Sequence, residues 1–410
     1  MLRRLGPAAP LLLASALAAQ EPRDSAAQRA QQELRNDSAA VQDVHPQDSP
    51  EYRGFVVETR DRRSRLRVLG SLRTFAVYDL KGLQGARDFS VYDIPVGPGN
   101  VAEGRFYMEA SQSRFGLEAT TRKSRTVPEL FGRLETDFRG ANNSLRLRHA
   151  FVRWGPFTVG QTWTTAAHVS TLPTTVDAEG PNSAITLRSV QVRYTRQLSS
   201  GVAFSGAIEN PSPDLTTTFA TQPVNSRIPD LVARVRGAQG VRELQMAGII
   251  RSLPFADSTG NVRDVTGWGV ALSGRFGMRA DKDELLFQGI WGHGIARYVA
   301  GFTGRGLDLT LDSATGAVYA TALRGAYLSY GHLLQPGLSA YGTVGYARID
   351  NRAFEPPTAF KRGGYLALSL FRDTPWGARV GFEYTFGTRV NKDNASDWAH
   401  RLQAIVYYDF

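Results

Sequence analysis

The sequence predicts an all-β protein, a sixteen-stranded antiparallel transmembrane β-barrel that follows a short N-terminal helical or disordered extension. Two patterns predict this fold. Apolar and polar residues alternate along segments of about ten or more residues, and longer connections alternate with short ones along the chain. Because side chains alternate between the two faces of a strand, such segments present one apolar face to lipid and one wet face to the barrel interior.

The first element is a secretory signal peptide over residues 1–19. Arg3 and Arg4 precede a short apolar run over residues 7–17, and small residues follow it. This run is too short to span a membrane as a helix, whereas it fits the apolar core of a cleavable signal. We expect cleavage after Ala18 or a residue or two later.

The second element is a periplasmic extension over residues 20–50. Small and apolar residues recur there at the spacing of a coiled-coil seam, but Asp37 interrupts the seam and fewer than three heptads are present. A short coiled coil and a disordered tail therefore both remain open. If the chain trimerises, the coiled coil would wind three such helices together.

The third element is the barrel itself, over residues 65–410, with an even number of strands. The predicted strands are residues 65–80, 105–120, 127–139, 144–155, 157–164, 185–197, 202–209, 228–237, 241–252, 263–277, 284–292, 316–334, 338–350, 361–373, 378–389 and 398–410. The connections that begin at residues 81, 140, 165, 210, 253, 293, 351 and 390 include most of the long ones. Long external loops and short periplasmic turns are typical of outer-membrane barrels, and sixteen strands leave an aqueous channel.

The last predicted strand carries a distinct apolar face. Leu402, Ala404, Val406, Tyr408 and Phe410 share one face of it. An exposed edge strand of this kind invites aggregation, whereas closure of a barrel removes the edge. We therefore expect this strand to close the barrel.

Composition argues against enzymatic and nucleic-acid-binding functions. The chain has no cysteine and six histidines without metal-ligand spacing, and it lacks a Gly-x-Ser-x-Gly elbow. We accordingly expect no catalytic residue, no metal and no cofactor. The formal net charge is +10, but no basic helix or aromatic-basic module accompanies it. Basic rims that contact anionic outer-membrane lipid and lipopolysaccharide account for the charge more simply.

Arginines occupy the polar face of several predicted strands. Arg146 and Arg148, for example, alternate with Leu145, Leu147 and Phe151. An arginine on the lipid face at mid-bilayer costs about 2–4 kcal/mol, so these side chains are predicted to face the lumen. There they form an anion-attracting constriction, because a guanidinium matches a carboxylate in shape and charge. The primary candidates for this site are Arg146, Arg148 and Arg193, and the secondary ones are Arg114, Arg133 and Arg379.

The alternative is a structural lattice in which interior carboxylates neutralise the arginines. The acidic residues that would do so are Glu109, Glu118, Glu135, Asp137 and Glu383.

The external connection over residues 165–184 lies between the strands of the primary candidates. It carries His168, Asp177 and Glu179. If it folds into the lumen, its acidic residues would face the arginines across the opening. His168 then either tunes this field with pH or is an ordinary polar loop residue.

Several segments together resemble the DcaP-like porin family of Gram-negative bacteria. The segments that carry the resemblance, in chain order, are Gln112 to Gly116, Leu145 to Gly155, Val159 to Trp163, Thr175 to Asp177, Gly180-Pro181, Val192 to Tyr194, Gly292 to Tyr298, Tyr341 to Arg348 and Gly381 to Tyr384. The resemblance implies a homotrimeric sixteen-stranded porin that has an N-terminal periplasmic helix. It also implies that the porin takes up dicarboxylates and similar small organic anions. The short N-terminal heptads and the Gly/Pro-bearing loop over residues 86–104 depart from the family.

The function expected from the sequence is therefore passive diffusion of small hydrophilic solutes across the outer membrane, with a preference for organic anions. A non-selective general porin is the nearest alternative. An outer-membrane adhesin and a barrel lipase are more distant ones, and a lipase would need a lipid-facing Ser and His. His149 lies on the apolar side of its predicted strand.

Overall fold

A computed structural model describes residues 54–61, 63–83, 86–102, 104–122, 129–215, 224–257, 259–278 and 282–410. All of these belong to one unit, residues 45–410. The predicted signal peptide (1–19) and periplasmic extension (20–50) lie outside the described residues. Within the described residues, no helix is long and apolar enough to cross a membrane.

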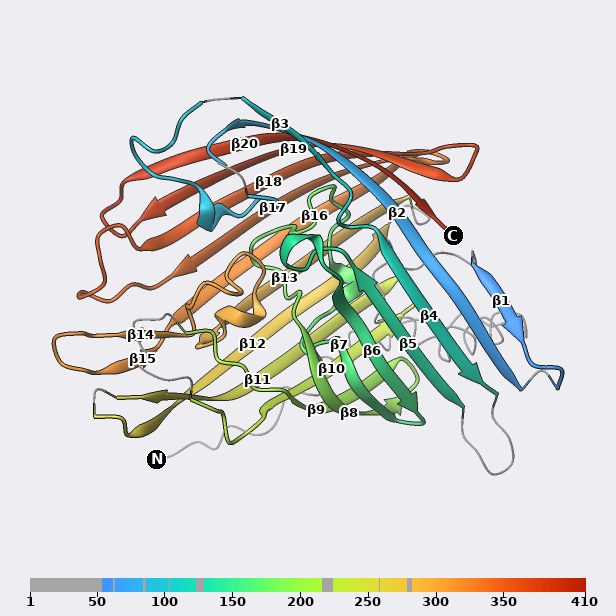
Figure 1. Cartoon of the computed structure of the whole chain (residues 1–410), viewed down its shortest axis with the longest axis horizontal. Coiled ribbons are helices and arrows are strands. Elements are labelled where there is room, and N and C mark those ends of the chain that lie inside the picture. The colour runs from blue at the N-terminus through green and yellow to red at the C-terminus, as the bar shows by residue number, and fades with distance from the viewer. Residues whose placement is uncertain are drawn as a thin grey trace, which may run out of the picture. The chain divides into compact units, whose positions relative to one another are not determined.

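The described strands form a barrel wall with sixteen positions, which confirms the predicted fold (Figure 1). The wall consists of β2 (Ser64–Lys81), β3 (Arg105–Glu109), β4 (Arg114–Thr121), β5 (Leu130–Asp137), β6 (Arg146–Trp154), β7 (Phe157–Trp163), β8 (Arg188–Ser199), β9 (Val202–Glu209), β10 (Asp230–Gln239), β11 (Arg242–Ala256), β12 (Val262–Met278), β13 (Asp283–His293), β16 (Ala322–Gln335), β17 (Leu338–Ile349), β18 (Phe360–Asp373), β19 (Ala378–Asn391) and β20 (Ser396–Asp409). Both β3 and β4 pair with β2, so together they fill one position.

Three short strands lie outside this count. β1 (Phe55–Glu58) pairs with the first part of β2, whereas β14 (Leu309–Leu311) and β15 (Val318–Ala320) form a hairpin within a loop. The predicted strand 316–334 thus corresponds to two strands, β15 and β16. Short 3₁₀ turns occur in the loops at Val91–Asp93, Ala141–Asn143, Val169–Thr171 and Ala296–Tyr298.

The last strand closes the barrel, as predicted. β20 pairs with β19 on one side and with β2 on the other, and Gln403 lies opposite Val77 in this closing pair. Leu402, Val406 and Tyr408 are exposed on the outer surface, whereas Gln403 is buried. The edge that the terminal strand would otherwise present is therefore satisfied by the first strand of the wall.

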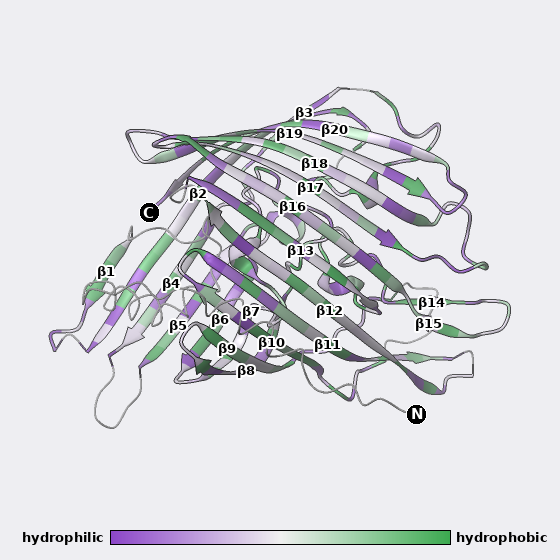
Figure 2. Cartoon of the chain, turned by 180° about the vertical axis from the view of Figure 1, so that it is seen from behind, coloured by the Kyte–Doolittle hydropathy of each residue, from purple (hydrophilic) through white to green (hydrophobic). Residues whose placement is uncertain are grey.

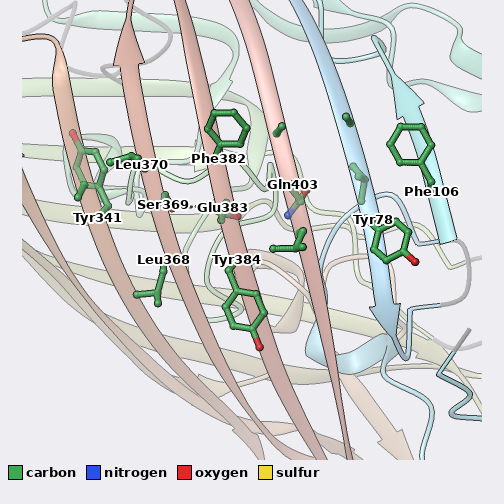
Figure 3. Close-up of a pocket in the computed structure, with 15 residues that line it drawn as sticks. Tyr78, Phe106, Tyr341, Leu368, Ser369, Leu370, Phe382, Glu383, Tyr384 and Gln403 are labelled. Atoms are coloured by element: carbon green, nitrogen blue, oxygen red, sulfur yellow. Dashed lines mark hydrogen bonds between the residues drawn. The ribbon is translucent and has the colours of Figure 1, made fainter. Parts of the chain in front are cut away.

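The wall has an apolar outer face and a mixed inner face. Figure 2 shows green and purple residues alternating along β2. On β18, Leu368 and Leu370 are exposed while Ser369 between them is buried, and on β19 Phe382 is exposed while Glu383 is buried (Figure 3). Such an apolar outer band matches the hydrocarbon of a bilayer.

A β-bulge in β6 changes one prediction. The pairing of β5 with β6 shifts after Glu135, which lies opposite His149, so Arg148 is an extra residue in its strand. Beyond the bulge the inward parity is reversed, because one inserted residue moves every later side chain to the other face. Phe151 and His149 are consequently buried, and the His149 ring contacts the Thr162 hydroxyl at 3.1 Å. The assignment of both residues to the outer, apolar face was wrong.

The connections at the two ends of the wall differ in length. One end, called here the turn end, has two-residue turns such as 155–156 and 200–201. Gly201 has a φ of +80°, and a Cβ there would lie 2.4 Å from the carbonyl oxygen of Ala238, so this tight turn requires glycine. The opposite end, called the loop end, carries the long connections, although those at 257–261 and 392–395 are short.

Three long loops pack together inside the barrel at the loop end. They are residues 82–104, residues 164–187 (the lumenal loop) and residues 294–321. Their buried apolar side chains form one cluster with inward-facing residues of the wall; examples are Phe89, Val91, Val169, Ile185, Tyr298, Phe302, Ile290, Leu323 and Tyr365. The interior is therefore partly filled by a hydrophobic core, because these loops bury apolar area against the wall.

Candidate functional site

The lumenal loop crosses the barrel interior and docks on strands far from its own ends. The His168 ring contacts Ser273 of β12 and Glu243 of β11, each at 2.9 Å. Further on, the Tyr327 hydroxyl of β16 donates to the Thr171 carbonyl at 3.0 Å. A loop that leaves β7 and returns to β8 thus contacts strands well separated from them in the wall.

Glu383 of β19 fixes the far part of the lumenal loop. Its carboxylate accepts hydrogen bonds from the backbone N–H groups of Val176 at 2.7 Å and Asp177 at 3.0 Å, and from the Ser369 hydroxyl at 2.6 Å. Gln403 of β20 donates to the Asp177 carboxylate at 3.3 Å. Backbone groups bound by a buried carboxylate hold the loop in one position.

A cavity of about 440 Å³ lies between this part of the loop and the wall from β2 to β8. Six arginines and four acidic residues line it. They are Arg73, Arg114, Arg139, Arg146, Arg148 and Arg188, with Asp88, Asp137, Asp177 and Glu179. The cavity thus contains more arginines than carboxylates.

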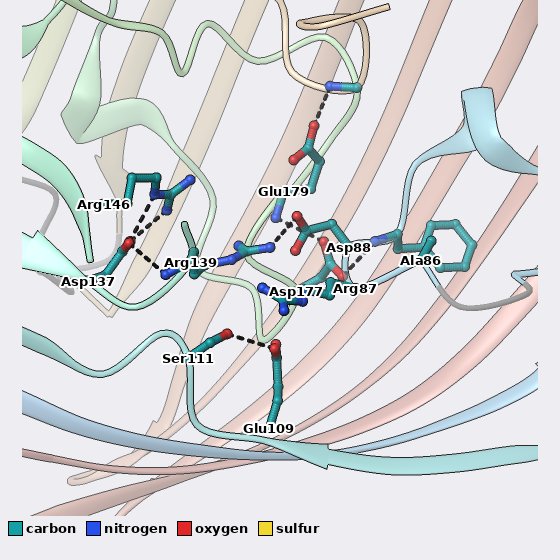
Figure 4. A network of polar contacts seen from close by, with 12 residues as sticks. Ala86, Arg87, Asp88, Glu109, Ser111, Asp137, Arg139, Arg146, Asp177 and Glu179 are labelled. Carbon is teal, nitrogen blue, oxygen red and sulfur yellow. Dashed lines mark hydrogen bonds and ion pairs between the residues drawn. The ribbon is translucent and has the colours of Figure 1, made fainter. Parts of the chain in front are cut away.

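Two of the primary candidate arginines line this cavity and share a carboxylate. Arg146 binds Asp137 through two hydrogen bonds of 2.9 and 2.6 Å (Figure 4). Arg148 contacts the same Asp137 at 3.1 Å and Glu135 at 2.6 Å. The Arg146 side chain is 42% exposed and the Arg148 side chain only 6%. Arg146 is therefore the more accessible of the two to a solute.

The other candidate arginines differ in whether they line the cavity. Arg114 lines the cavity. Arg133, Arg193 and Arg379 are absent from its lining as far as the described residues show. Arg133 is buried between Glu135 and Glu118, Arg193 is buried on β8, and Arg379 pairs with Asp373 at 3.0 Å near the turn end.

The carboxylates of the alternative, structural lattice differ in the partners that they bind. Glu118, Glu135 and Asp137 contact arginines. Glu109 instead accepts a hydrogen bond from Ser111 at 2.8 Å, and Glu383 binds the lumenal loop.

The three candidate residues of the lumenal loop have different surroundings. Asp177 and Glu179 line the cavity, whereas His168 lies against the wall. Burial, reinforced by the Asp88 carboxylate, raises the pKa of Asp177 and raises that of Glu179 to about 7. Burial and the nearby Arg236 guanidinium lower the pKa of His168 to about 4, despite its contact with Glu243. At neutral pH, His168 is therefore uncharged and Glu179 is only partly ionised.

Two buried arginines hold the other loops inside the barrel. Arg401 of β20 pairs with Asp79 at 2.5 Å and donates to the carbonyl oxygens of residues 86 and 87. Arg251 of β11 pairs with Asp230 at 3.0 Å and with Asp308 of loop 294–321 at 2.8 Å. Removal of one partner from such a buried network is strongly destabilising, because a charge is left uncompensated.

Besides Arg73, Asp88 and Arg139, the cavity residues that the sequence analysis missed include Trp163 and Arg188. They lie opposite each other at the loop ends of β7 and β8, and both line the cavity. Arg188 shares its strand parity with Val190, which is exposed on the outer face, so the alternation pattern gave no sign of its position. The only available signal was an arginine at a predicted strand end, next to the loop expected to enter the lumen.

Comparisons with known proteins agree with this architecture. The DcaP outer membrane protein family matches residues 58–410. A search of curated proteins finds no match.

Solved structures share the fold at low sequence identity. The outer membrane channel DcaP of Acinetobacter baumannii superposes with a TM-score of 0.74 at 19% identity, covering 87% of this chain and 99% of that one. An anion-selective porin from Comamonas acidovorans gives 0.56 at 10% identity, with 85% and 100% covered. A trimer form of OmpT, an outer membrane protein of Vibrio cholerae, gives 0.54 at 13% identity, with 85% and 99% covered.

The closed sixteen-position wall, the apolar outer face and the interior loops are those of an outer-membrane channel, and the family match extends over nearly the whole barrel. The chain therefore belongs to the DcaP outer membrane protein family, as a porin of the Gram-negative outer membrane.

Proposed function

We propose that this porin passes small hydrophilic solutes by passive diffusion and prefers organic anions such as dicarboxylates. The observation that carries the proposal is the composition of the cavity beneath the lumenal loop, where six arginines face four acidic residues. Arginines at a narrow point attract anions, and their planar forks suit carboxylates. Of the predicted arginines, Arg114, Arg146 and Arg148 line this cavity, and the proposal is that they act on the solute.

The acidic side of the cavity supports the same preference. Because the pKa of Glu179 is raised to about 7, this group carries less negative charge near neutral pH than an ordinary carboxylate does. The charge that a passing anion meets is therefore more positive than the residue count alone implies.

A non-selective general porin is the second candidate, and the ion pairs favour it. Asp137 already binds Arg146 and Arg148, and Arg139 pairs with Asp88 at 2.5 Å. Paired charges attract a passing ion less strongly than free ones. In this case the arginines would hold the wall together without selecting the solute.

The reversal potential in a planar bilayer under a potassium chloride gradient separates the two candidates. Reversal towards the chloride equilibrium potential, with brief current blockades on addition of succinate or phthalate, is the result expected for an anion-preferring channel. Reversal near zero or on the cation side, without blockade, would contradict the preference and leave the general porin.

A matched pair of double variants tests whether the cavity arginines act on the solute. Arg146 and Arg148 share Asp137, just as Arg324 and Arg348 share Asp350 away from the cavity. We expect R146A/R148A to reduce the anion preference, while the control R324A/R348A leaves it unchanged. An equal effect of both variants would show that only net charge matters.

We also propose that the protein is a homotrimer. The shared barrel fold with the trimer form of OmpT from Vibrio cholerae supports this assembly. Native mass spectrometry of the detergent-solubilised full chain should give three times the mass of the mature chain. A mass of a single chain would contradict the proposal.

A further inference from the structure

Trp163 and Arg188 form a stacked pair on the cavity wall. They are directly opposed residues of β7 and β8, and the guanidinium carbon of Arg188 lies 3.8 Å from the centroid of the Trp163 ring. Trp163 is only 5% exposed, and both residues line the cavity under the lumenal loop. The indole therefore holds the guanidinium at a fixed place in the wall.

Both residues of this pair carry hydrogen-bond donors that are not used within the described part of the chain. The indole N–H (Nε1) of Trp163 and the Nε–H of Arg188 are buried and have no hydrogen-bond partner among the described residues. No described carboxylate lies within ion-pair distance of Arg188 either, whereas Arg146 and Arg148 both bind Asp137. Buried donors without an acceptor are unfavourable, so an acceptor that enters the cavity would satisfy them.

We propose that Trp163 and Arg188 form a carboxylate-binding site in the channel, an inference that rests on the proposed anion-conducting function. The Arg188 guanidinium binds the carboxylate, and the Trp163 indole orients the guanidinium and supplies a further N–H. Arg114, Arg146 and Arg148 line the same cavity, so a bound anion also relieves the repulsion among these cations. A second carboxylate on the same small molecule would face those arginines.

Succinate blockade of single channels tests this site, with the purified full chain in planar bilayers. We expect R188Q to weaken succinate blockade by about tenfold or more, because a charge-assisted pair is lost. R188K, which keeps the charge but not the planar fork, should also weaken blockade. The control R324Q removes the same charge from an exposed arginine outside the cavity and should match the wild type.

A second variant keeps the test independent of whether R188Q folds. W163F keeps a smaller aromatic ring in place of the indole and removes the indole N–H, and we expect it to weaken blockade by about two- to tenfold. The site is overturned if W163F and the Arg188 variant that inserts into the bilayer are both blocked by succinate as strongly as the wild type. In that case an anion preference of the wild type would still support the proposed function. If the wild type itself shows neither anion preference nor blockade, the proposed function fails, and the site fails with it.

Discussion

Glu383 should control the width of the channel, although it does not line the arginine-rich cavity. Replacing it with alanine removes the acceptor for the Val176 and Asp177 backbone N–H groups, which are bound at 2.7 and 3.0 Å. Each buried donor left without a partner costs about 1–3 kcal/mol, so the docked position of the loop loses about 2–6 kcal/mol. Since 1.4 kcal/mol is a factor of ten, the detached state gains at least about thirtyfold in population.

The assay is single-channel recording in potassium chloride together with succinate blockade. E383A should conduct more, show greater open-channel noise and block less, because the loop that narrows the lumen spends more time away from β19. E383Q keeps one carbonyl oxygen and should lie between E383A and the wild type. S369A is the matched control, because Ser369 donates to the same carboxylate at 2.6 Å without contacting the loop backbone. Conductance and noise identical to the wild type in correctly folded E383A would refute the assignment of Glu383 as the anchor of the loop.

Three further predictions follow from the loop contacts. The pKa of Glu179 is raised to about 7, so its protonated form is favoured in the folded state, and its contribution to stability is lost as pH rises through 7. Because Glu179 becomes negatively charged over the same range, the anion preference should fall between about pH 6 and pH 8. The reversal potential of E179Q should not change over that range. The pKa of His168 is lowered to about 4, so the stability that its neutral ring contributes is present above its unfolded-state pKa of about 6.5 and is lost as pH falls towards 4. Channel noise should therefore rise on acidification in the wild type and much less in H168Q. An equal rise in both would exclude His168 as the source of the noise. R251M leaves the buried Asp230 and Asp308 carboxylates uncompensated at a cost of about 3–5 kcal/mol, and the temperature at which the folded barrel unfolds on a denaturing gel should drop clearly below that of the wild type.

The barrel was predictable from the sequence because its pattern is local. Alternation with a period of two places Leu402 and Val406 towards lipid and Gln403 towards the lumen, whichever strands lie beside them. The cost of an arginine in lipid likewise decides that Arg146 and Arg148 face inward. Strand number and barrel closure followed from these patterns together with the alternation of loop lengths.

The local rule failed where one inserted residue or one strand end changed the parity. The bulge at Arg148 turned His149 and Phe151 inward, and Arg188 entered the cavity although it shares the parity of an outward-facing residue. A bulge is defined by pairing with a neighbouring strand, so no property of a single strand discloses it. Arg188, which we propose as part of the carboxylate site, was missed because it lies at a strand end, where the alternation no longer decides which way a side chain points.

By itself the sequence determined that this chain is an outer-membrane barrel with an arginine-bearing interior, since side-chain alternation and the exclusion of charge from lipid act residue by residue. Only the tertiary structure decided how the lumenal loop lies and which arginines are paired. Those outcomes depend on contacts such as that between Val176 and Glu383, whose partners are 207 residues apart in the chain. Closure of the barrel brings such partners together, and their hydrogen bonds then fix the loop in the lumen.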